Sequence, residues 1–107
     1  MRVLLDECIP RRLRRELRGH EVATATSEGW AGRRNGDLLR LMLAAGFRVF
    51  VTVDRNLAYQ QNVAAAGVAV IVLRARSNRE HDLLPLVPAL LAAIETAPIG
   101  QVTHVAG

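Results

Sequence analysis

The sequence predicts a three-layer α/β domain in which helices cover both faces of a mostly parallel sheet. Short apolar runs alternate with segments of helical spacing along the 107 residues, and the connections between them are short. The run VAVIVL (68–73) is apolar throughout, as expected of a strand buried on both faces. We therefore expect one domain over 1–107, right-handed crossovers, a core strand order of 2-1-3-4 and the last strand at an edge.

The first half of the chain contains two predicted strands and one predicted helix. RVLLD (2–6) is a short apolar run between polar residues, and EVATA (21–25) is a weaker strand. Pro10 suits the first turn of a helix that ends at Gly19. Its apolar face is Ile9, Leu13 and Leu17, and its other face is Arg11, Arg12, Arg14, Arg15 and Arg18. The segment 27–36 is rich in turn residues and predicts a loop.

Two helices and a strand follow. Asn35 can cap a helix over 36–45, which Gly46 ends. RVFVTV (48–53) is rich in β-branched residues and is followed by Asp54. Asn56 can cap the next helix, which runs to Ala66.

The last third predicts a helix and an edge strand. Ser77 and Glu80 have the spacing of a capping box. An apolar stripe follows, and Pro85 and Pro88 should kink or split the helix that carries it. The final strand is expected at 101–105.

Composition restricts the class of protein. The net charge is +4, and every basic residue is an arginine, which favours polyanionic partners. The apolar runs are too short for a membrane span and the N-terminus lacks a signal-peptide core, so we expect a cytoplasmic protein without membrane contact. One cysteine and three scattered histidines show no zinc-ligand spacing, so a metal would be bound by oxygen.

Carboxylates follow the predicted strands. Asp6 and Glu7 end the first strand and Asp54 follows the third, so the order 2-1-3-4 makes these ends neighbours. Asp37, in the first turn of the helix after the second strand, can lean over the same edge. Clustered carboxylates stay ionised when they bind a hard divalent cation, so we expect Mg²⁺ or Mn²⁺ here.

Each acid also has a purely structural interpretation. Asp6 or Glu7 could cap the first helix, Asp37 could complement a helix dipole, and Asp54 could begin a turn. The coincidence of Asp6 and Asp54 at one sheet edge favours the metal site.

Two chemistries match acids at the ends of the first and third strands. A phosphoacceptor receiver domain places acids there, but such domains have a lysine at the end of the last strand and this chain has no lysine, so it is the less favoured alternative. A metal-dependent nuclease uses the same acids to hold cations that orient water at a phosphodiester. The arginines on the first helix and in the flanking loops suit the second chemistry.

Four stretches resemble small PIN-like proteins related to the PIN-domain toxin ribonucleases and to the Mut7-C type domain. They are LLDECIPRRL, NGDLL, VFVTVDRNLAYQQN and VAVIVLRARSN, which span most of the chain from 1 to about 94. The recurring features of that family are an acid after the first strand, an acid that opens a middle helix and a T-x-D triplet after a later strand. Asp6, Asp37 and the triplet Thr52-Val53-Asp54 match them.

The resemblance implies a three-layer PIN-like fold and a Mg²⁺- or Mn²⁺-dependent endoribonuclease, the toxin of a bacterial type II toxin–antitoxin pair. Its catalytic and metal-binding residues would be Asp6, Asp37 and Asp54, with Glu7 as a supporting ligand and Thr52 and Asn56 as supporting residues. RNA would contact Arg11, Arg12, Arg33, Arg34 and Arg55.

The expected partners are RNA and a cognate antitoxin, and the apolar stripe of the last helix also suits a homodimer. The chain is shorter than a standard PIN domain, because the 26–36 loop replaces a further acid-bearing helix. The alternative is therefore a catalytically weak or inactive PIN-like module that binds RNA or protein.

Overall fold

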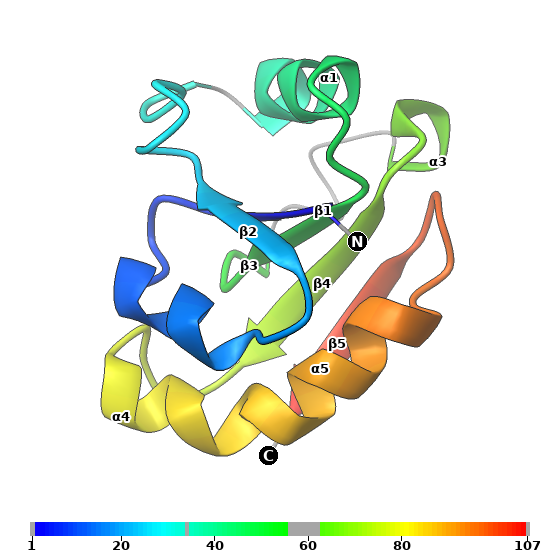
Figure 1. Cartoon of the computed structure of the whole chain (residues 1–107). Coiled ribbons are helices and arrows are strands. Elements are labelled where there is room, and N and C mark those ends of the chain that lie inside the picture. Colours follow the sequence, from blue (N-terminus) through cyan, green and yellow to red (C-terminus); the bar gives the residue numbers. More distant parts are fainter. Residues whose placement is uncertain (1, 34, 56–62, 107) are drawn as a thin grey trace.

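The sheet has the predicted order and direction. The computed structural model describes residues 2–33, 35–55 and 63–106. Within these ranges, five strands form one parallel sheet in the order β2-β1-β3-β4-β5, with β5 at an edge (Figure 1). The strands are β1 (Arg2–Leu5), β2 (Glu21–Thr24), β3 (Val49–Thr52), β4 (Ala69–Arg74) and β5 (Val102–Ala106).

Helices cover both faces of this sheet, which confirms the three-layer α/β class. They are η1 (Arg11–Glu16), α1 (Asn35–Ala44), α3 (Val63–Ala66), α4 (Glu80–Leu83), η2 (Leu84–Leu86) and α5 (Val87–Thr96). The predicted first helix is a short 3-10 helix, and α3 is the described part of the helix predicted to end at Ala66.

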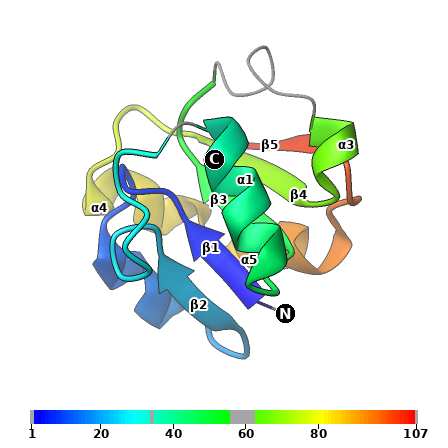
Figure 2. The same cartoon turned by 90° about the horizontal axis from the view of Figure 1, so that it is seen from above.

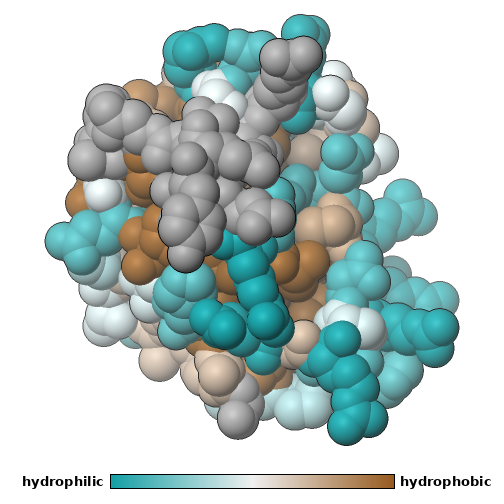
Figure 3. Space-filling view, turned by 180° about the vertical axis from the view of Figure 1, so that it is seen from behind, coloured by the Kyte–Doolittle hydropathy of each residue, from teal (hydrophilic) through white to brown (hydrophobic). Residues whose placement is uncertain are grey.

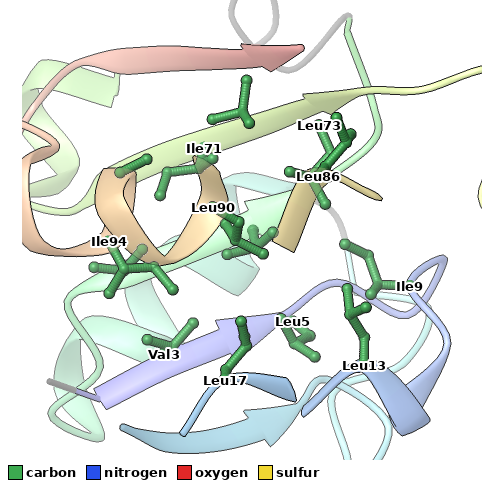
Figure 4. Packing of buried hydrophobic residues seen from close by; sticks show 14 of the residues in the cluster. Val3, Leu5, Ile9, Leu13, Leu17, Ile71, Leu73, Leu86, Leu90 and Ile94 are labelled. Carbon is green, nitrogen blue, oxygen red and sulfur yellow. The ribbon is translucent and has the colours of Figure 1, made fainter. Parts of the chain in front are cut away.

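Alternate residues of each strand divide the core into two apolar layers. One layer joins η1, α4, η2 and α5 to one face of the sheet (Figure 4). The other joins α1 and α3 to the opposite face, where Leu38, Leu39 and Met42 of α1 are buried. Figure 2 shows α1 and α5 on opposite sides of the sheet.

The last connection has the opposite hand to the connection before it. Both β3 to β4 and β4 to β5 move one strand in the same direction across the sheet. However, α3 lies on one face, whereas α4, η2 and α5 lie on the other. The expectation of right-handed crossovers throughout is therefore wrong. The reason is burial. Helices α1 and α3 cover one face of β3 and β4. On the other face, Val51, Ile71 and Leu73 are buried by the last helices.

The two prolines divide the last helical segment as predicted. Pro85 lies in η2, between α4 and α5, and Pro88 lies in the first turn of α5. The predicted capping box of Ser77 and Glu80 is wrong. The N-cap residue is Arg79, whose guanidinium has no acceptor with which to cap the helix. The Ser77 hydroxyl is engaged elsewhere: it donates to Asp82 Oδ2 at 2.6 Å and accepts the Arg79 N–H at 3.0 Å.

The surface is mixed in polarity. The view from behind shows hydrophilic side chains over much of that face, most densely at the lower right, with apolar patches between them toward the middle (Figure 3). Within the described ranges, none of the helices combines the length and apolar character needed to cross a bilayer.

Leu90→Ala tests whether α5 packs on the same face of the sheet as η1. Leu90 is fully buried, so we expect the free energy of unfolding to fall by about 2–5 kcal/mol in a urea titration. Leu84→Ala is the matched control, because Leu84 is 37% exposed in η2 and should cost much less. Equal losses for the two variants would contradict the packing of the last helices on β3 and β4.

Candidate active site at the carboxyl edge of the sheet

Pairing of β1 with β3 places Asp6 beside the end of β3. Leu5 is in register with Val51, and the Asp6 N–H donates to the Val51 carbonyl at 2.9 Å. Asp6 is therefore held at the carboxyl edge of the sheet, where ligands bind in open parallel α/β folds.

Thr52 connects Asp6 to the segment that follows β3. Its hydroxyl is buried, donates to Asp6 Oδ2 at 2.6 Å and accepts the Asp54 N–H at 3.0 Å. The other oxygen of Asp6, Oδ1, accepts the Glu7 N–H at 2.8 Å. Both carboxylate oxygens thus have fixed partners, which orients the Asp6 side chain. We call Asp6, Thr52 and the main chain of Asp54 the edge network.

Cys8 lies against this network, a position that no pattern in the sequence predicts. Its thiol lies 3.5 Å from Asp6 Oδ2 and 3.9 Å from Thr52 Oγ1. Burial raises the pKa of the Cys8 thiol, and the negative charge of Asp6 adds to this effect, whereas hydrogen bonds from the Val53 main chain and Thr52 oppose it. The thiol is therefore held neutral beside the carboxylate.

The other two predicted acids contact different partners. Asp37, in the first turn of α1, forms an ion pair with Arg40 one turn later. The Glu7 carboxylate accepts the Gly32 N–H, with N···O distances of 3.2 and 3.3 Å, so it faces the loop between β2 and α1. Within 2–33, 35–55 and 63–106, no three His, Cys, Asp or Glu side chains are grouped so as to hold a metal ion.

The predicted RNA-binding arginines are distributed over three places. Arg11 and Arg12 lie on η1, where they and two further arginines line a depression of about 290 Å³. Arg33 lines a separate hollow beside Asp37 and Arg40, and Arg55 is exposed after β3. Arg34 and Asn56, also predicted to contribute, lie outside the described residues.

Contacts from α4 and the loop before it hold the turn after β1. Asn78 Nδ2 donates to the Cys8 carbonyl at 2.8 Å, and Arg12 lies 3.8 Å from Glu80 across the η1–α4 boundary. Sequence reasoning missed Asn78, because nothing local to residues 75–80 indicates that they approach residue 8.

Comparisons with protein-family models, curated proteins and solved structures found no match.

Thr52→Val tests the edge network. Valine keeps the shape of threonine but removes the hydroxyl, so Asp6 loses a donor and the Asp54 N–H loses its acceptor. We expect a loss of about 1–3 kcal/mol in the free energy of unfolding. Thr103→Val, on edge strand β5 and half-buried, is the matched control and should cost clearly less. A Thr52→Val protein as stable as the control variant would contradict the network.

The thiol of Cys8 should react slowly and only at high pH. Because its folded pKa is raised, the thiol stays protonated to a higher pH than a free cysteine does. The rate of iodoacetamide labelling should therefore rise with pH to a midpoint above that of N-acetylcysteine in the same buffers. For the same reason, the free energy of unfolding should fall as the pH rises from the unfolded-state pKa of the Cys8 thiol to its higher folded pKa. In that range the unfolded chain can ionise the thiol and the folded chain cannot. A labelling midpoint below that of N-acetylcysteine would contradict the placement of a buried Cys8 thiol beside the Asp6 carboxylate.

Proposed function

We propose that this protein is a PIN-like Mg²⁺- or Mn²⁺-dependent endoribonuclease, acting as the toxin of a type II toxin–antitoxin pair. The observation that carries the proposal is the edge network, in which β1 and β3 present a hydrogen-bonded Asp6 beside Thr52 and Asp54. The arginine-rich η1 begins five residues after Asp6 and supplies the positive charge that an RNA backbone requires.

The side chains at this edge suit a hard divalent cation in their chemistry. Mg²⁺ is commonly held by one or two carboxylates, with water and substrate phosphate completing its coordination. Asp6 and Asp54 are the ligands that we assign first. Asp37 and Glu7 would have to leave Arg40 and Gly32, their present partners, to join them.

The chain's own residues position and attract the substrate. When bound, the cation supplies a polarised water and stabilises negative charge on the scissile phosphate. Thr52 holds Asp6 in one orientation, so the carboxylate does not have to reorganise. Arginines of η1 bind phosphate, which carries no base identity, so cleavage should depend weakly on sequence.

The proposed partner is an antitoxin that covers the carboxyl edge. Such a protein would compete with RNA for the same arginines, and acidic side chains would complement their charge.

A second candidate is an RNA- or protein-binding module without cleavage. The pairing of Asp37 with Arg40 and of Glu7 with Gly32 favours it, because both acids are then engaged away from Asp6. Under this alternative, the edge network has a structural role and RNA binding needs no divalent cation.

Asp6→Asn and Asp54→Asn test the nuclease. Wild-type protein should cleave a fluorescent single-stranded RNA with Mn²⁺ and not with EDTA, and each variant should lose more than about 100-fold in rate. Glu95→Gln is the control with the same loss of charge on α5, and circular dichroism checks that all variants fold. Cleavage that persists in both aspartate variants overturns the proposal. Tight RNA binding in EDTA without any cleavage by wild type selects the binding module instead.

A further inference from the structure

A pocket separate from the edge network is lined by residues of the turn after β1, of helix η1, and of β2 and the loop after it. Its volume is about 330 Å³. Two arginines, one carboxylate, hydroxyl groups and apolar side chains line it. These residues are Glu7, Ile9, Pro10, Arg11, Arg14, Thr24, Thr26 and Ser27.

The two arginines give this pocket positive charge that no ion pair among the described residues neutralises. Arg11 and Arg14 are exposed, and neither forms an ion pair in the part of the chain that the structure describes. Both also line the arginine depression on η1, so the two hollows share one wall. An arginine fork matches the oxygens of a phosphate group, and charge-assisted bonds of this kind are the strong ones.

The opposite wall is held by internal hydrogen bonds. Ser27 Oγ accepts the Thr24 N–H at 3.0 Å, and Thr24 Oγ1 accepts the Ser27 N–H at 2.9 Å. The loop is anchored further by Trp30, whose ring packs edge-to-face on Phe47 with 6.1 Å between centroids. Because these side chains are already ordered, ligand binding costs little further conformational entropy on this wall.

Glu7 adds a second kind of recognition. Its carboxylate accepts Gly32 N–H, which leaves lone pairs that can accept hydrogen bonds from a ligand. A carboxylate repels phosphate but accepts bonds from sugar hydroxyls. Ile9 and Pro10 offer apolar surface beside it.

We propose that this pocket binds one ribonucleotide unit, with its phosphate at Arg11 and Arg14 and its ribose hydroxyls at Glu7. The inference rests on the proposed function in one respect: the unit would belong to the RNA strand that passes Asp6, one residue from Glu7. A hydroxyl contact at Glu7 would distinguish RNA from DNA, since the 2′-hydroxyl is the group that differs.

The test is a titration of the whole protein in EDTA, followed by nuclear magnetic resonance. The ligands are adenosine monophosphate, its 2′-deoxy form, inorganic phosphate and a short oligoribonucleotide. Arg11→Ala and Arg14→Ala should each weaken binding of adenosine monophosphate by about tenfold or more. Arg18→Ala removes the same charge from an exposed position that does not line the pocket, so it should change the affinity little.

Glu7→Gln separates the two contacts. It should reduce the preference for the ribose form over the deoxy form, whereas inorganic phosphate should bind at least as well as before. Equal losses in Arg14→Ala and Arg18→Ala overturn the proposal, as does inorganic phosphate binding as tightly as the nucleotide. Binding is measured in EDTA and therefore independently of cleavage. If the pocket does not bind the nucleotide but the protein cleaves RNA with Mn²⁺, only the pocket proposal is wrong. If the pocket binds the nucleotide but the protein does not cleave RNA, only the nuclease proposal is wrong.

Discussion

Parallel pairing of β1 with β3 is the constraint on which this structure depends. The register of Leu5 with Val51 brings Asp6 to the Thr52 hydroxyl, 46 residues away in sequence. A fully buried hydroxyl needs partners, and Thr52 has one on each side, the Asp6 carboxylate and the Asp54 N–H. The Thr52–Asp6 hydrogen bond therefore joins the carboxyl ends of β1 and β3, and it also orients the Asp6 carboxylate at the sheet edge.

Charge is distributed unevenly around that edge. Asp6 is held by main-chain and hydroxyl donors, whereas Asp37 is balanced by Arg40 on its own helix. Arg11 and Arg14 form no ion pair in the described part of the chain, and they face a pocket that Glu7 also lines. We interpret this arrangement as a surface for a phosphate-bearing chain, with the ordered carboxylate at one end and positive charge beside it.

Local patterns predicted most of the fold. Apolar runs located the five strands, and the prolines at 85 and 88 located the breaks in the last helical segment. The failures are non-local. Ser77 bonds Asp82 instead of forming a capping box, and the last crossover takes the hand that buries the uncovered face of β3 and β4. At the site, the sequence indicated that Asp6 and Asp54 follow neighbouring strands at one sheet edge, but nothing in it showed that Thr52 bonds Asp6 or that Glu7 turns to Gly32. The Glu7–Gly32 contact joins residues 25 positions apart in the chain, so it depends on the tertiary path of the loop between β2 and α1.

Localisation of a divalent cation tests the central claim most directly. Substoichiometric Mn²⁺ should broaden the amide resonances of Asp6, Glu7 and Asp54 before others in the ¹⁵N-labelled protein, because paramagnetic broadening falls steeply with distance. Asp6→Asn should remove that selective broadening while the rest of the spectrum is unchanged. Broadening spread evenly over exposed acids such as Glu16 and Glu95, and unaltered in Asp6→Asn, would contradict a metal site at the carboxyl edge.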